Sequence, residues 1–354
     1  MFSLDELKQI QLCRQHLTDK ADKHTVCHDL NGIQAQFTVN VEHSLKIRCN
    51  ERIEKDNYGN SLVKNWTIRN TVHVFNQEDL PIFKYQDEGN PYLSHNWNLK
   101  NFFIDWIRNE CRMSPDRLEH IARFIVDKVS NGVTTREDLK REYYSAGITE
   151  IEVGSIFNQW GGLLRPLCER GFLYYKVQEK KEFMTCPPYT PMEQDEALIE
   201  QARRYFTHFA PATVKDISYY FGWTQTYTKE LMKKLPLSNM QINGKDYYYL
   251  GALQSDYPDI PHCIFLAGFD QLMLGYQKSE SIYLPQEHLR GVFNLAGIVM
   301  PSILLKGKVV GKWKKEKTKL IITLFENVTP KDKQSIIQVA ECSWNDMKKI
   351  EWKS

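Results

Sequence analysis

The chain of 354 residues has little net charge, no closely spaced cysteine pair and no long apolar segment. A formal net charge of +2 does not indicate a globally basic nucleic-acid binder, so affinity for a polyanion must come from local patches. No apolar run approaches the ~20 residues that span a bilayer. The first residues do not form a basic and then apolar signal sequence. We therefore expect a cytoplasmic protein that does not enter a membrane.

The eight cysteines are scattered, and no two of them form a C-x-x-C pair. We expect reduced thiols, as is usual in the cytoplasm. His24, Cys27 and His28 lie close together in the sequence. Without a second ligand pair at zinc spacing this is a weak metal signal, so we expect no metal site.

What the chain does contain is an order of short helices followed by β-prone runs, which occurs three times. Three helices and a two-stranded hairpin form a winged helix, a module that binds nucleic acids. Capping residues Ser114 and Thr135 support the second occurrence, and an Asn243-Gly244 turn supports the third. The predicted helices and strands are 4–17, 21–30 and 66–75; 115–130, 135–143, 149–159, 171–177 and 181–184; and 193–209, 214–221, 227–235 and 240–249.

The remainder of the chain is β-rich. Strands are predicted at 262–276, 298–305, 308–313 and 320–325, with a helix at 331–349. The fold class is therefore α+β: three tandem winged helices, then a small β-barrel or sheet with a terminal helix. We expect domains at 1–110, 111–190, 191–258 and 259–354.

A lysine-rich hairpin is predicted within this last domain. Seven lysines and a single acid, Glu316, lie between residues 306 and 319, together with Trp313. Positive charge beside an exposed aromatic ring suits a phosphate backbone. An edge hairpin protected by solvated lysines explains the pattern equally well. The candidate DNA contacts are Lys306, Lys308, Lys312, Trp313, Lys314 and Lys315.

The candidate catalytic residues are Gln34 and Gln36, which flank Ala35. Positions i and i+2 lie on opposed faces of a helix but on the same side of an extended segment. If both amides serve one site, the backbone here must be non-helical. Taken alone, such a pair is better explained as two solvated glutamines at a helix start.

Four motifs, in order along the chain, resemble those of the AlkZ/YcaQ-like winged-helix DNA glycosylases. They are a Gln-apolar-Gln motif at 32–36, Arg69-x-Thr71-x-His73, a Phe-Asp-x-x-Leu-Leu-Gly segment at 268–276, and a Gly-containing hairpin ending in Trp at 304–313. Lys306 replaces the usual Asp of that hairpin. Val299-Met300-Pro301 lacks the His of the family's His-apolar-Pro motif. Gln36, where YcaQ-type members have Asp, makes the match AlkZ-like.

The resemblance implies a monofunctional glycosylase that hydrolyses the N-glycosidic bond of N7-alkylated purines, crosslinked ones included. Gln34 and Gln36 would position a water and place carbonyl oxygen near oxocarbenium charge. Arg69 and His73 would join the lysines in contacting DNA. No cofactor is implied. The expected partner is double-stranded DNA with alkylated purines, bound by a monomer that associates with the nucleoid.

Two alternatives do not involve catalysis. Tandem winged helices could form a transcription regulator that reads DNA through a helix such as 227–235, although no dimerisation coiled coil is evident. A protein–protein scaffold of winged helices would have no affinity for DNA.

Overall fold

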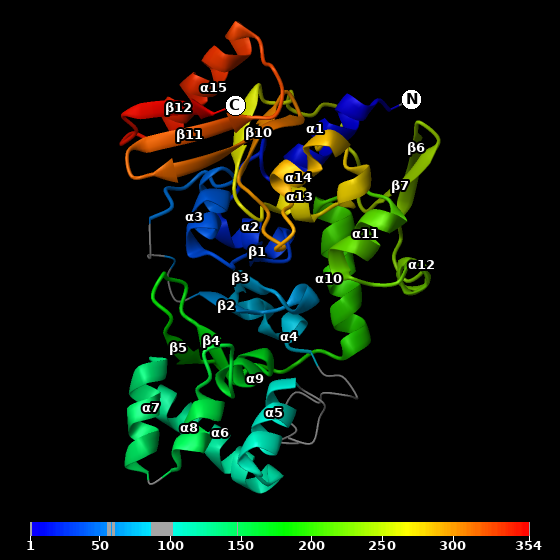
Figure 1. The fold of residues 1–354 in the computed structure, drawn as a ribbon. Coiled ribbons are helices and arrows are strands. Elements are labelled where there is room, and N and C mark those ends of the chain that lie inside the picture. Colours follow the sequence, from blue (N-terminus) through cyan, green and yellow to red (C-terminus); the bar gives the residue numbers. More distant parts are fainter. Residues whose placement is uncertain (1, 55–57, 59–60, 86–101, 147, 354) are drawn as a thin grey trace. The chain divides into compact units, whose positions relative to one another are not determined.

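The computed structural model describes residues 2–54, 58, 61–85, 102–146 and 148–353. It divides into two compact units (Figure 1). Residues 1–54 and 201–354 form the discontinuous unit, and residues 55–200 form the inserted unit. The division into four domains stays a prediction. No helix in the described part of the chain is long and apolar enough to cross a membrane.

The discontinuous unit begins with short, well-capped helices. Ser3 forms a capping box with Glu6, and the Asp22 carboxylate accepts bonds from two backbone amides of the next helix. Asn31 and Gly32, at φ 53° and 84°, then turn the chain into a short strand. The elements are α1 (Leu4–Arg14), α2 (Lys23–Asp29), β1 (Ile33–Gln34) and α3 (Thr38–Lys46).

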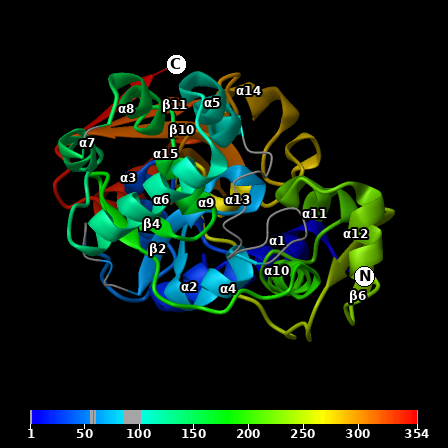
Figure 2. The same cartoon turned by 90° about the horizontal axis from the view of Figure 1, so that it is seen from below.

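The third predicted helix–hairpin segment has the expected elements. Thr213 and Thr224 cap their helices with their hydroxyl groups, and Asn243-Gly244 turns the hairpin with positive φ at both residues. Figures 1 and 2 both place α11 and α12 side by side. The elements are α10 (Gln194–His208), α11 (Val214–Phe221), α12 (Gln225–Met232), β6 (Ser238–Ile242) and β7 (Lys245–Tyr249).

The C-terminal part is an open sheet of five strands in the order β12-β11-β10-β9-β8. The sheet prediction is confirmed, and the barrel prediction is wrong because β12 and β8 are free edges of this sheet. Neighbouring strands are antiparallel except β11 and β12. Helix α15 packs its Ile336 and Ala340 on one face. The elements are β8 (Cys263–Leu266), α13 (Gln271–Leu274), α14 (Leu289–Val292), β9 (Ser302–Leu305), β10 (Lys308–Glu316), β11 (Lys319–Leu324), α15 (Pro330–Ser343) and β12 (Lys349–Lys353).

Two predictions in this region need correction. The strand expected at 262–276 ends at Leu266, because the Asp270 carboxylate caps the short helix α13. The terminal helix ends at Ser343 instead of 349, and the chain continues as β12. Ile350 and Trp352, which alternate along β12, pack against the core beneath α15. Their period of two is a strand signal that the sequence reading missed.

The inserted unit combines two hairpins with a helical core. Its strands lie in the order β3-β2-β4-β5. The single strand predicted at 66–75 is wrong, because Arg69 and Asn70, both at φ 53°, turn the chain there. Ser114 and Thr135 cap their helices as predicted, and Thr149 caps the next helix. The elements are β2 (Leu62–Trp66), β3 (Val72–Asn76), α4 (Leu80–Phe83), α5 (Phe102–Cys111), α6 (Pro115–Ser130), α7 (Arg136–Ser145), α8 (Glu150–Ile156), α9 (Leu164–Glu169), β4 (Leu173–Tyr175) and β5 (Phe183–Thr185).

Candidate functional site

Gln34 and Gln36 lie on non-helical backbone, as the pattern predicts for two amides that serve one site. Gln34 ends β1, and α3 begins only at Thr38. The two side chains differ in exposure: Gln34 is 5% exposed, whereas Gln36 is an exposed residue. The Gln34 Oε1 atom accepts a bond of 3.1 Å from the Gln36 backbone amide. Because an N–H donor needs an oxygen acceptor, this bond fixes which way the Gln34 amide faces.

Buried side-chain amides hold the backbone just before Gln34. Gln271, in α13, donates from its side chain to the Gly32 carbonyl at 2.6 Å. Asn31 donates to the Gln201 carbonyl at 2.9 Å. Both amide side chains are fully buried. Such bonds in a low-dielectric interior fix a loop because breaking them leaves unpaired polar groups.

A fully buried ion pair lies at the start of α13, next to the Gln271 that bonds Gly32. Arg48 donates two bonds to the Asp270 carboxylate, at 2.7 and 2.9 Å, and neither side chain is exposed. Arg48 also donates to the Gln15 carbonyl and to Ser44. The Asp270 carboxylate in turn accepts from the Leu272 amide. The charges are therefore paired and hydrogen-bonded on both sides, which is the condition for keeping them buried.

Close packing joins the glutamine loop to the segment 268–275. A Cβ atom on Gly268 would lie 2.8 Å from the Asn40 side chain in α3, so a larger residue there would have to displace that side chain. The Phe269 ring lies 6.2 Å from the ring of Phe37, which is 47% exposed and follows Gln36. The Phe269 amide also donates to the Val299 carbonyl.

Val299 closes a short loop that presents an exposed apolar side chain. Phe293 and Val299 form an antiparallel bridge, and Leu295 between them is 89% exposed. Asn294 stabilises the loop by accepting from the Ile298 amide through its side chain. Phe269 thus contacts the exposed Phe37 through its ring and the end of the loop that carries Leu295 through its backbone.

The lysines of the hairpin are mostly paired within the chain. Five of the seven contact carboxylates: Lys306 with Asp332, Lys308 with Glu326, Lys314 with Glu316, Lys315 with Asp346 and Lys319 with Glu351. Lys312 and Lys317 have no carboxylate partner among the residues that the structure describes. Lys314 keeps 69% of its side chain exposed, and Lys315 only 20%. The free positive charge is therefore smaller than the sequence indicates.

Comparisons with known proteins agree with these motifs. The family model described as DNA glycosylase AlkZ-like matches residues 28–341. This chain belongs to the AlkZ-like DNA glycosylase family. A curated relative, the interstrand DNA cross-link repair glycosylase of Streptomyces sahachiroi, is 23% identical over 316 residues, covering 84% of this chain and 83% of that protein. The solved structure of S. sahachiroi DNA glycosylase AlkZ matches the fold with a TM-score of 0.74 and 20% identity, covering 99% of each chain.

Within this AlkZ-like chain, three predicted DNA contacts lie in distinct environments. Trp313 is 9% exposed and donates to the Leu266 carbonyl at 2.9 Å, so the expectation of an exposed ring was wrong. His73 is 4% exposed and bonds Thr67, and burial lowers its pKa to about 4. Arg69 is exposed on the turn between β2 and β3. Of the three, Arg69 alone presents a charged group at the surface.

Several residues around the site could not be predicted from the sequence. Arg48 carries no motif, and its partner Asp270 is 222 positions away. Gln271 occupies a position that the family pattern leaves free, so its bond to Gly32 becomes visible only in the structure. Leu295 follows Asn294 in a short loop, where a single leucine gives no periodic signal.

Proposed function

We propose that this protein is a monofunctional DNA glycosylase that hydrolyses the N-glycosidic bond of N7-alkylated purines in duplex DNA. The observation that carries the proposal is the exposed Gln36 beside the buried Gln34, on a loop held by bonds from Gln271 and Asn31. The buried Arg48–Asp270 pair lies next to Gln271 at the start of α13. A loop held this firmly is preorganised, and preorganised polar groups are the main source of transition-state stabilisation. Membership of a DNA glycosylase family supports the same reaction.

The two glutamines have unequal roles in this proposal. Gln36 faces solvent, so its amide contacts the lesion and the attacking water. Gln34 bonds the Gln36 backbone amide and therefore sets the position of Gln36. Neither amide is a base, and each supplies orientation and a dipole near the developing positive charge of the sugar.

Two neutral glutamines are sufficient for this reaction because the leaving group already carries a positive charge. An N7-alkylated purine is already cationic, so its departure needs no general acid. The bond between C1′ and N9 breaks with its electron pair going to N9, which neutralises the ring. The water oxygen bonds to C1′, and the water's proton passes to solvent. A neutral uracil or hypoxanthine would need a proton that the glutamines cannot supply.

In this proposal the discontinuous unit contacts DNA through exposed side chains of the glutamine loop, of the loop 293–299 and of the lysine-rich hairpin. Phe37 and Leu295 are apolar and exposed, the type of side chain that wedges against bases. Lys312 and Lys314 supply phosphate contacts. The winged helices, including α12, add backbone contacts along the duplex. Because the S. sahachiroi relative is named a cross-link repair glycosylase, crosslinked purines belong to the proposed substrate range.

A panel of duplexes, each with one altered base, tests this proposal. Under single-turnover conditions the protein should release N7-methylguanine and leave uracil and hypoxanthine in place. The rate should be flat near neutral pH, and the abasic product should stay intact until it is treated with alkali. Efficient uracil release, or an adduct trapped by borohydride, would show that another catalytic group acts. Binding without release of any base would favour a transcription regulator.

A further inference from the structure

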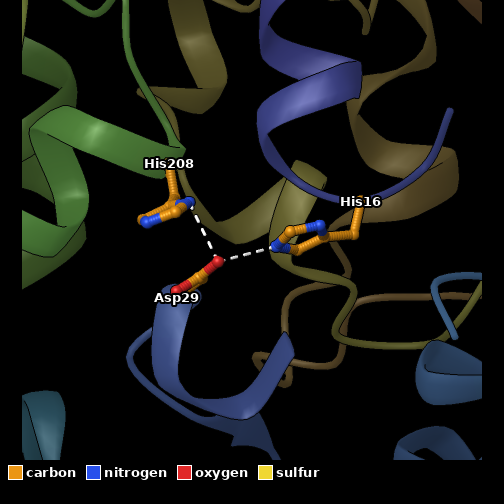
Figure 3. Close-up of side chains that lie close together, drawn as sticks. All are labelled: His16, Asp29 and His208. Carbon is orange, nitrogen blue, oxygen red and sulfur yellow. Dashed lines mark hydrogen bonds and ion pairs between the residues drawn. The ribbon is translucent and has the colours of Figure 1, made fainter. Parts of the chain in front are cut away.

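A second cluster of chemically active side chains lies apart from the two glutamines. His16 follows α1, Asp29 ends α2 and His208 ends α10, all within the discontinuous unit (Figure 3). The Asp29 Oδ2 atom lies 2.9 Å from His16 Nε2 and 3.3 Å from His208 Nδ1. One ligand atom from each of the three residues lies within 4.8 Å of the others.

Counting protons shows that these contacts are not satisfied by neutral imidazoles. His16 Nδ1 faces the Asp19 carbonyl at 3.1 Å, and a carbonyl only accepts. With its one proton there, neutral His16 turns a lone pair on Nε2 towards the Asp29 carboxylate. A lone pair of His16 therefore points at a carboxylate.

A cation resolves this conflict, and the surroundings have the features of a metal site. Histidines that ligate metals donate their other ring nitrogen to a carbonyl or carboxylate, as His16 does to Asp19. The second carboxylate oxygen of Asp29 is held by His28 Nδ1 at 2.8 Å.

We propose that His16 Nε2, Asp29 Oδ2 and His208 Nδ1 bind a zinc ion, with a water as the fourth ligand. Bonds of ~2.0–2.2 Å in a tetrahedron separate ligand atoms by roughly 3.4 Å, so the observed spacing needs only a small adjustment. Side chains that are 11–20% exposed leave a path for the ion. The metal connects the ends of α1, α2 and α10, and its ligand Asp29 lies five residues before Gln34. Its role is to hold this framework, and the hydrolysis of the glycosidic bond does not use it.

The experiment is cobalt and zinc binding by the full chain after chelator treatment. One Co²⁺ per protein should bind with the visible absorption of a tetrahedral site, and Zn²⁺ should displace it. At a hundredfold excess over Kd, Zn²⁺ should raise Tm by roughly 5–10 °C. Asp29→Asn and His208→Ala should abolish binding. His28→Ala should weaken it ~10–100-fold through the orientation of Asp29. His120→Ala, on the surface of α6, is the matched control and should change nothing.

Two results would overturn the proposal. One is no stoichiometric binding by the folded wild-type protein, with NMR showing both His16 nitrogens protonated at pH 7, which would make the cluster an imidazolium–carboxylate pair. The other is binding that Asp29→Asn leaves unchanged, which would place the metal elsewhere, for example on a thiol. Circular dichroism of each variant separates loss of the metal from loss of the fold.

Discussion

Asp270→Asn removes one charge from an ion pair whose two side chains are both fully buried. Arg48 would keep its bonds to Ser44 and to the Gln15 carbonyl, and Asn could still accept from the Leu272 amide. The guanidinium charge, however, would lose its counterion in the interior. Breaking such a pair costs about 3–5 kcal/mol. Because the Asn oxygen preserves part of the network, we expect about 3 kcal/mol.

This loss is large against a total stability of about 5–15 kcal/mol. With a urea m value of about 3 kcal/mol/M, the midpoint of unfolding should fall by about 1 M at unchanged m. Glu280→Gln is the control, because Glu280 pairs with Lys215 and Lys245 at a solvent-exposed site. Its loss should cost less than about 1 kcal/mol.

The double variant Arg48→Met/Asp270→Leu sharpens the test. Apolar side chains of similar volume leave no uncompensated charge, so its stability should lie above that of Asp270→Asn. Excision should still fall in both variants, because the start of α13, which carries the Gln271 that bonds Gly32, loses its ion pair. An Asp270→Asn variant that stays within about 1 kcal/mol of the wild type and excises at the wild-type rate would refute the claim that the ion pair supports this site.

Two further predictions concern charge. Burial lowers the pKa of His73 to about 4 from its ordinary value of about 6.5. Between these pH values the unfolded chain binds more protons, so the free energy of unfolding rises with pH. The difference in this free energy between pH 5 and pH 7, measured with urea, should be smaller in His73→Gln than in the wild type, and an equal difference would contradict the burial argument. Replacing Lys312 and Lys314 with Gln should weaken DNA binding on all sequences and reduce the logarithmic salt slope by about one per contact. Lys315→Gln is the control, because the Lys315 side chain is only 20% exposed, against 69% for Lys314; an unchanged slope in the double variant would make the hairpin a solvated edge.

The sequence predicted the elements better than it predicted their environments. Caps at Ser114, Thr213 and Thr224 are local, so the helices that they begin were found. The family resemblance located the segment 268–276. The strand expected there was wrong, because the Asp270 cap starts a helix of four residues in a run of mostly apolar side chains. Burial depends on long-range packing. Trp313 therefore looked like an exposed ring among lysines, although it contacts His43, Phe265 and Trp344 in the core.

The candidate site shows the same division. Two amides that serve one site at this spacing require non-helical backbone, and the backbone at Gln34 and Gln36 is non-helical. Their unequal exposure could not be predicted, because it depends on the bond from the Gln36 amide to Gln34 and on the supports behind the loop. His16, Asp29 and His208 are 13 and 179 positions apart, so their approach follows only from the fold.

Single-turnover excision of N7-methylguanine by Gln34→Ala and Gln36→Ala decides whether this loop is the reaction centre. Removing one preorganised polar contact typically slows an enzyme ~10²–10³-fold, so Gln36→Ala should lose at least ~10²-fold in rate. Gln34→Ala should also be slow, because the position of Gln36 depends on it. DNA affinity and Tm should stay close to those of the wild type in Gln36→Ala. Rates equal to the wild type in both variants would contradict the assignment.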